Sequence, residues 1–131
     1  MDGKITGYFT HIIERAKITF PQVQYQIDNT PKRAILRLNA FYGEYQILVT
    51  ELLSNEARQY RYYVLKDDWV KAGFDNAPDP RAIRLKYGKI GYEHSGEFIP
   101  HLHLENKNEL LLTEDITFDI FIDWLKANLS V

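Results

Sequence analysis

The chain has 131 residues and a formal net charge of -2, with 45% hydrophobic and 26% charged residues, as is typical of a globular domain. It contains no cysteine, which excludes disulfides, thiolate nucleophiles and cysteine-ligated metal sites. The slightly acidic balance gives no overall attraction to nucleic acid, so any phosphate-binding site needs a local basic patch.

The first predicted element is an amphipathic helix over residues 3–17. Its apolar residues recur with helical spacing and form one stripe: Ile5, Tyr8, Phe9, Ile12, Ile13 and Ala16. Pro21 ends this helix, because proline removes a backbone donor and disfavours helix at the preceding Phe20. We therefore expect one face of the helix to pack against the rest of the domain.

Alternating apolar and polar residues then predict a series of β-strands joined by short turns. The first, residues 22–28, is expected to be half-buried through Val23, Tyr25 and Ile27. The others cover residues 33–41, 44–53, 58–65 and 69–74. Short strands joined in this way favour an antiparallel meander.

Residues 76–99 interrupt this alternation with prolines, glycines and basic residues. We expect a long irregular connection there, with at most a short strand within residues 85–92, and such connections are usually functional or mobile. Residues 101–104 and 110–112 are predicted to form a last hairpin. A C-terminal helix is predicted from about Thr117, with Thr113 or Thr117 as its cap.

These elements predict an α+β fold, an antiparallel meander sheet of about five to seven strands with one N-terminal and one C-terminal helix. We expect a single domain over residues 1–131, because this length suits one sizeable core. Both helices are expected to cover one face of the sheet. The opposite, aromatic face is expected to be partly exposed, with Tyr45 and Tyr63 as candidates for a contact in a homodimer or a complex.

The location of the protein is the next expectation. The N-terminal residues lack the apolar run of a secretion signal, and no stretch reaches the roughly 20 apolar residues that span a bilayer. Together with the lack of cysteine, this suits a cytoplasmic protein without a membrane partner.

The histidines of the last hairpin are the main candidates for chemistry. His101 and His103 lie two residues apart in a predicted strand, so their side chains leave it on the same face. Asp75 follows directly after another predicted strand. Two imidazoles can act as base and acid near neutral pH, for example in cleaving RNA through its own 2′-hydroxyl, with Asp75 aiding them.

Two other interpretations of these three residues stay open. The histidines can occupy solvent-facing positions of an edge strand and do nothing further. They can also chelate a metal ion with Asp75 as the third ligand. Metal-independent acid–base catalysis is the leading hypothesis, so we expect neither a metal ion nor another cofactor.

Residues near the predicted pair are candidates for substrate binding. Glu51 lies on a largely apolar strand face and could orient an imidazole. If the tyrosines of the next strand flank the histidines, they could stack bases, and these are Tyr60, Tyr62 and Tyr63. In ordinary proteins such residues more often belong to the surface of a sheet.

The amide and the basic residues that follow Asp75 complete the candidate binding site. Asn76 belongs to a run with the composition of a turn. The basic residues form the one phosphate-binding patch that the sequence predicts, through Arg81, Arg84 and Lys86. A basic run of this kind is otherwise a solvated loop.

Several well-known motifs are missing from the sequence. It has no glycine-rich phosphate loop, Gly-x-Ser-x-Gly elbow, His-Glu-x-x-His helix or helix-turn-helix pair. This removes nucleoside-triphosphate enzymes, α/β-hydrolases, zincins and simple DNA-reading repressors from the leading candidates.

The order of the candidate residues resembles that of one protein family. Glu51 is followed by the tyrosine-rich run 60–63, and then by Phe74-Asp75-Asn76-Ala77-Pro78, Pro100-His101-Leu102-His103 and the helical stretch 118–125. Over about residues 34–125 the chain thereby resembles the TumE-type toxins of prokaryotic toxin–antitoxin systems, with the Asp-Asn-Ala-Pro run as the most specific part. Many relatives carry His-His directly after this proline, where the present chain has Asp79-Pro80.

The resemblance implies a cytoplasmic toxin that is neutralised by a cognate antitoxin protein. Combined with the histidines, it leads us to expect the toxin component of a prokaryotic toxin–antitoxin system that acts on RNA as a metal-independent ribonuclease. The alternative is a non-catalytic interaction module of the same fold, in which the same face engages a partner protein or a small ligand.

Overall fold

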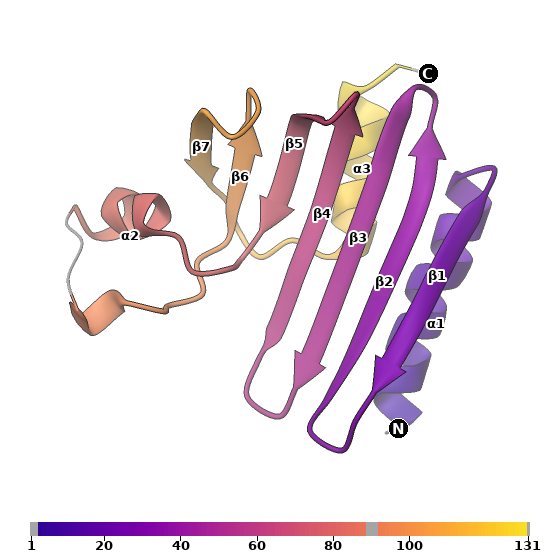
Figure 1. The fold of residues 1–131 in the computed structure, drawn as a ribbon, viewed down its shortest axis with the longest axis horizontal. Coiled ribbons are helices and arrows are strands. Elements are labelled where there is room, and N and C mark those ends of the chain that lie inside the picture. The colour runs from indigo at the N-terminus through magenta and orange to yellow at the C-terminus, as the bar shows by residue number, and fades with distance from the viewer. Residues whose placement is uncertain (1–2, 89–91, 131) are drawn as a thin grey trace.

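The computed structural model describes residues 3–88 and 92–130, and in them it forms a seven-stranded sheet in the order β1-β2-β3-β4-β5-β6-β7 (Figure 1). Every strand pairs antiparallel with the next strand in the chain. The elements are α1 (Gly3–Thr19), β1 (Val23–Asn29), β2 (Arg33–Tyr42), β3 (Tyr45–Ser54), β4 (Arg58–Lys66), β5 (Trp69–Asp75), α2 (Pro80–Tyr87), the 3-10 helix η1 (Tyr92–His94), β6 (His101–Leu104), β7 (Glu109–Leu112) and α3 (Phe118–Asn128). The predicted α+β meander is confirmed.

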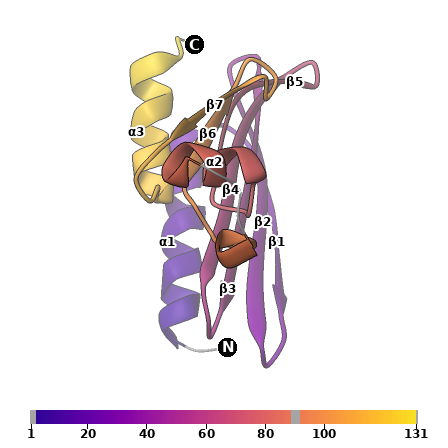
Figure 2. The same cartoon turned by 90° about the vertical axis from the view of Figure 1, so that its left-hand side faces the viewer.

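The two terminal helices lie on the same face of the sheet, as the sequence predicted (Figure 2). The stripes of α1 and α3 bury Phe9, Ile12, Phe121 and Leu125 against the alternate residues of the central strands. Each fully buried side chain of this size stabilises the fold by about 1.5–3 kcal/mol. The helix-covered face is therefore the core, and the opposite face has no helical layer in either view (Figures 1 and 2).

The helix α3 begins where the sequence allowed it to begin. Thr117 is its N-cap and accepts a hydrogen bond from the backbone N–H of Ile120, so Thr117 rather than Thr113 has this role. Among the helices of residues 3–88 and 92–130, none combines the length and the apolar character needed to cross a bilayer.

The burial predicted for the first strand is wrong. In β1, Tyr25 is 48% exposed and Ile27 is 37% exposed, although both lie opposite buried leucines of β2. The reason is that β1 is an edge strand with a neighbour on one side only. The alternation of apolar and polar residues thus predicted the position of the strand correctly but overstated its burial.

The irregular connection predicted for residues 76–99 contains a helix instead of a short strand. Asp79 caps α2 by accepting a hydrogen bond from the N–H of Arg81, Pro80 occupies the first helical position, and Gly88 ends the helix with φ 78°. The sequence Asp-Pro followed by a glycine one helix length later carried this signal. The helix lies beside β7, next to the hairpin that carries the histidines (Figure 1).

The contact surface expected around two tyrosines is not present. Tyr63 is buried, and Tyr45 is half-buried against the core on the helix-covered face. The physical reason is that Tyr63 lies flat over Gly73 of the next strand, where no side chain competes for the space. Neither ring is free to form a broad aromatic patch.

Candidate functional site

The candidate site lies on the sheet face that the helices leave uncovered. Across β4, β5 and β6, Tyr62 pairs with Phe74 and Phe74 with Leu102, and all of them point into the core. The next row along the strands points the other way, and it joins Arg61 to Asp75 and Asp75 to His101. The row on the other side of Phe74 joins Tyr63 to Gly73 and Gly73 to His103.

Strand pairing brings the three predicted catalytic residues together. The Nε2 of His101 is 3.0 Å from Oδ1 of Asp75, and the Nε2 of His103 is 3.4 Å from Oδ2 of the same carboxylate. The two Nε2 atoms are 3.1 Å apart. We call these residues the Asp75 triad.

The triad is buried, which corrects two expectations at once. Asp75 is 4% exposed, His101 1% and His103 3%. The histidines are therefore not surface residues of an edge strand, because β6 is paired with β5 on one side and with β7 on the other. They also do not lie on an open face, as the sequence suggested, but form the floor of a pocket.

Hydrogen bonds fix the orientation of both imidazoles. The Nδ1–H of His101 donates to the backbone carbonyl of Ile99 at 2.7 Å, because a carbonyl can only accept. This bond directs Nε2 of His101 toward the other two residues. An Nη2–H of Arg81 points to Nδ1 of His103 at 3.5 Å, at the outer limit of a hydrogen bond.

The carboxylate at the centre has partners for both of its oxygens. The backbone N–H of Ala77 donates to Oδ1 at 3.0 Å, and the hydroxyl of Tyr63 donates to Oδ2 at 2.7 Å. Burial alone would raise the pKa of Asp75, but the hydrogen bonds from His101, His103 and Tyr63 outweigh it and hold this pKa well below its usual range. Asp75 is therefore a carboxylate at neutral pH.

The charge of Asp75 acts on the imidazole opposite to it. Burial would lower the pKa of His101, but the hydrogen bond to Asp75 and the carbonyl of Ile99 outweigh it, so this pKa is raised. The same carboxylate affects Tyr63, whose pKa is raised by burial and by the nearby negative charge. His101 and Asp75 are thus prepared to form an ion pair inside the protein.

The Asp-Asn-Ala-Pro run builds one wall of the site, although Asn76 does not bind in it. The Asn76 side chain accepts from the N–H of Tyr60 at 3.0 Å and donates to the carbonyl of Arg58 at 2.9 Å. It therefore ties the end of β5 to β4, and the predicted binding role of Asn76 is replaced by a structural one. Ala77 and Pro78 line the pocket.

The triad opens into a pocket of about 260 Å³. Its lining comes from β4, β5, β6, the start of α2 and the β6–β7 turn, and it consists of Gln59, Arg61, Tyr63, Asp75, Ala77, Pro78, Asp79, Arg81, His101, His103 and Lys107. Arg61 and Lys107 both lie over the ring of Tyr63, at 5.0 and 5.1 Å from its centroid. The pocket therefore combines a buried carboxylate and two imidazoles with basic groups around them.

The predicted basic patch is only partly in this pocket. Arg81 lines it, whereas Arg84 and Lys86 are exposed on α2 outside the lining, and Lys86 faces Glu97 at 3.5 Å. Arg61 and Lys107 also line the pocket, and neither was predicted to bind. The alternation of β4 places Arg61 on the face of Tyr63, so that position could have been found, but a turn residue such as Lys107 has no such signal.

Three other predicted binding residues belong to the opposite face. Glu51, Tyr60 and Tyr62 are fully buried under the helices, so they cannot flank the histidines. Their strand parity matches that of the core residues and not that of Tyr63. The prediction for these residues is wrong because the carboxylate of Glu51 has its own partners in the core, among them Arg58.

Those partners define a second buried group, which we call the Glu51 cluster (Tyr8, Glu51, Arg58 and Tyr62). Arg58 donates to both oxygens of Glu51, at 3.1 and 3.2 Å, and its Nη2 also donates to the carbonyl of Ile116 at 2.7 Å. Tyr8 of α1 donates to Glu51 at 3.0 Å, and Tyr62 donates to the same carboxylate. The cluster connects the sheet to α1 and to the segment that precedes α3.

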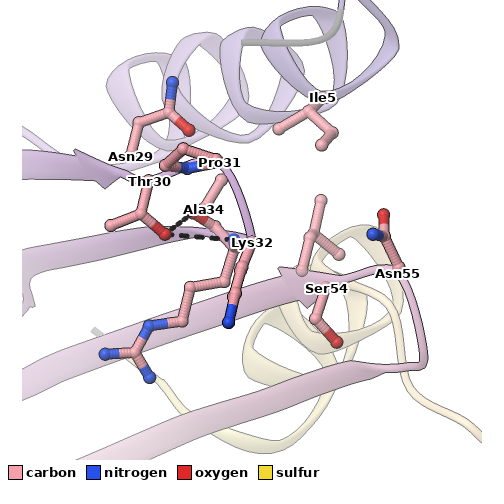
Figure 3. A pocket seen from close by; sticks show the side chains of 10 residues that line it. Ile5, Asn29, Thr30, Pro31, Lys32, Ala34, Ser54 and Asn55 are labelled. Carbon is pink, nitrogen blue, oxygen red and sulfur yellow. Dashed lines mark hydrogen bonds between the residues drawn. The ribbon is translucent and has the colours of Figure 1, made fainter.

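A larger pocket, of about 470 Å³, lies at the β1–β2 turn (Figure 3). Figure 3 shows Ile5 above it and the turn residues Asn29 to Lys32 on one side, with Thr30 hydrogen-bonded to the backbone of the turn. Its lining contains no histidine and no acid. The described lining thus offers neither an imidazole nor a carboxylate, and the smaller pocket over the triad is the candidate site.

Comparison of the chain with family models, with curated proteins and with solved structures finds no match. A carboxylate and two Nε2 atoms within hydrogen-bond distance of one another can transfer protons or hold a cation, and the basic groups beside them suit an anionic substrate.

Proposed function

We propose that the protein is the toxin component of a prokaryotic toxin–antitoxin system and that it cleaves RNA in the triad pocket. The observation that carries the proposal is the position of Arg61, Arg81 and Lys107 around a buried group of two imidazoles and a carboxylate. Arginine and lysine side chains bind phosphate, and arginine does so with two parallel hydrogen bonds. A phosphodiester bound there would have its phosphorus next to the triad.

The assignment of a toxin rests on the resemblance to the TumE-type family. The run that carries it most specifically, from Asp75 to Pro78, supplies the central carboxylate and part of the pocket wall. The paired histidines supply the other side of the triad. Two runs of the resemblance, residues 75–78 and 101–103, thus meet at one place in the fold, which supports a common activity located there.

The spacing of the imidazoles gives the triad one reactive position instead of two. A base and an acid on opposite sides of an in-line phosphate must lie roughly 6 Å apart or more, because each is about 3 Å from its own oxygen. The two Nε2 atoms are 3.1 Å apart and both face the same carboxylate. His101 and His103 therefore act on the same atom of the substrate or on a group bound between them.

The test is cleavage of an RNA oligonucleotide by the purified protein, with a DNA oligonucleotide of the same sequence as the control substrate. Replacing His103 by Ala should lower the rate by about 100- to 10,000-fold. Arg61→Ala should weaken binding and reduce its salt dependence, whereas Lys126→Ala, which removes an exposed charge on α3, should change neither. All variants must keep the wild-type circular dichroism spectrum.

Expression in cells without the antitoxin gives the second readout. The wild type should arrest growth and degrade total RNA, and His103→Ala should do neither. Growth arrest by wild type and variant alike, with intact RNA in both, would overturn the ribonuclease and leave a module that acts by binding a partner.

A further inference from the structure

We infer that the Asp75 triad is a binding site for a divalent transition-metal ion, held by Nε2 of His101, Nε2 of His103 and one oxygen of Asp75. The inference concerns the chain alone and does not depend on RNA being the substrate. It replaces the expectation of a site without metal, and it follows from distances, burial and hydrogen bonds around the triad.

The separations of the three ligand atoms fit one metal ion. Ligands at about 2.1 Å from a metal lie roughly 3.0 Å apart at a right angle and roughly 3.4 Å apart at a tetrahedral angle. Oδ1 of Asp75 lies 3.0 Å from Nε2 of His101 and Oδ2 lies 3.4 Å from Nε2 of His103, so each oxygen has this spacing to one histidine, and the two Nε2 atoms are 3.1 Å apart. The candidate ligand atoms lie within 4.8 Å of one another, and no other such group of three or more occurs in residues 3–88 and 92–130.

The hydrogen bonds behind the ligands have the pattern that metal sites use. Histidine ligands usually donate the proton of the second ring nitrogen to a carbonyl or a carboxylate, which leaves the first nitrogen free for the metal. His101 makes this bond to the carbonyl of Ile99. The carboxylate of Asp75 is held by the N–H of Ala77 and the hydroxyl of Tyr63, so its orientation is fixed from behind.

The pocket allows open coordination positions. Three protein ligands on one side of an ion leave its other positions directed toward the 260 Å³ cavity, as in catalytic sites that keep a place for water or substrate. Two imidazoles and a carboxylate suit first-row ions such as Zn²⁺, Co²⁺ or Mn²⁺. Arg61 and Lys107 line the same cavity, so an anionic oxygen is the natural ligand for an open position.

Arg81 works against metal binding at this place. Its Nη2 faces Nδ1 of His103 at 3.5 Å, and this nitrogen must carry the proton when Nε2 binds a metal. Half of the Arg81 side chain is exposed, and it also contacts Asp79 and the carbonyl of Lys107, so the guanidinium has other partners to turn to. Removing it should therefore favour the bound ion.

The experiment is a calorimetric titration of chelator-treated, dialysed protein with ZnCl₂, followed by the visible spectrum of the protein with Co²⁺. We expect one equivalent bound and a higher melting temperature. Asp75→Asn and His103→Gln should each weaken binding by more than about 100-fold, beyond the effect of losing an outer hydrogen-bond partner. His94→Ala, which removes the histidine paired with Glu97 at the surface, should leave binding unchanged, and Arg81→Ala should leave it equal or tighter.

The results divide clearly. No binding of Zn²⁺ or Co²⁺ by the folded wild type would overturn the inference, as would binding that survives both triad substitutions or is lost in His94→Ala or weakened in Arg81→Ala. RNA cleavage that continues in excess chelator, without metal binding, would remove the metal site and leave the proposed function standing. Metal binding at the triad without RNA cleavage would support the metal site and overturn the proposed ribonuclease.

Discussion

The Asp75 triad and the Glu51 cluster are two buried polar groups on opposite faces of the same sheet. Each contains a carboxylate that is almost completely hidden from solvent and a tyrosine that donates to it. The partner of Glu51 is the guanidinium of Arg58, and α1 and the segment before α3 close over the pair. The partners of Asp75 are two imidazoles beside a pocket.

The difference shows that burial and hydrogen bonding do not separate a structural group from a functional one. Burial would lower the pKa of Arg58, but Glu51 outweighs it and raises this pKa, so Arg58 keeps its positive charge in the folded protein. Imidazoles gain and lose protons near neutral pH and bind metals. The type of the partner and the presence of a cavity are the features that distinguish the two groups.

The largest expected loss of folding stability comes from a substitution in the Glu51 cluster. Glu51→Ala leaves the positive charge of Arg58 without its main partner, and breaking a buried pair in this way costs about 3–5 kcal/mol. Asp75→Ala should cost less, about 1–3 kcal/mol, because His101 can give up its proton. Urea unfolding at neutral pH measures both, and a shift in the midpoint at constant slope shows that stability itself has changed. A larger loss for Asp75→Ala would reverse the comparison.

Gly73→Ala should give the next largest loss of stability, and this loss concerns the sheet face that carries the Asp75 triad. A Cβ at Gly73 would lie 2.9 Å from the ring of Tyr63, so the ring must move and take its hydroxyl away from Asp75. Overpacking of this kind costs about 1–3 kcal/mol. The matched control is Gly7→Ala in α1, where a Cβ meets nothing within 4 Å and the change should stabilise by about 0.4–1 kcal/mol. Equal effects at the two positions would contradict the close fit over Gly73.

The strands, the terminal helices and their arrangement could be predicted from the sequence, and there is a physical reason for this. Alternation of apolar residues reports which side of a strand is buried, and this placed His101 and His103 on one face and the two terminal helices on the other. It also implies that Tyr62 and Tyr63 point to opposite faces, so the two cannot both belong to one binding site. Strand parity, applied strictly, would have removed Tyr60, Tyr62 and Glu51 from the site.

Other features could not be obtained from local patterns. The burial of His103 depends on the pairing of β6 with both neighbours, and the position of Lys107 in the pocket depends on the conformation of a turn. The pairing of Glu51 with Arg58 is a matter of side-chain geometry that periodicity does not report. These are tertiary contacts, and each is set by parts of the chain that the local sequence does not contain.

Alkaline pH provides the third test, because the Glu51 cluster holds its tyrosines in the neutral form. Burial raises the pKa of Tyr8 to about 12, and burial with the charge of Glu51 raises the pKa of Tyr62 further. The unfolded phenols ionise near pH 10, so the unfolded chain releases protons that the folded protein keeps. The contribution of these neutral tyrosines to the free energy of unfolding should therefore be fully present below about pH 10 and decrease as the pH rises above it.

The contribution of Tyr62 to this pH dependence of stability can be measured separately. A phenol that ionises only in the unfolded chain lowers the free energy of unfolding by at most about 1.4 kcal/mol per pH unit. Tyr62→Phe should reduce the slope above about pH 10 by up to this amount, while Tyr25→Phe, on the exposed edge strand, should leave it unchanged. Urea midpoints measured in steps across this range give the slopes, and the same slope for all proteins would argue against a sealed cluster.

The smallest expected effect is that of Tyr63→Phe, and it tests how the triad carboxylate is supported. The change removes one hydroxyl donor from Asp75, which keeps the N–H of Ala77 and the two histidines, so no oxygen is left without a partner. The phenylalanine ring still covers Gly73 and still lies under Arg61. The loss of stability should therefore be close to that of one ordinary hydrogen bond, about 0.5–1.5 kcal/mol. Calorimetric titration of the same variant with Zn²⁺ should show an affinity lower by about 10- to 100-fold, because an outer partner of a ligand is gone. A purely structural hydroxyl would change the unfolding midpoint and leave that affinity as it was.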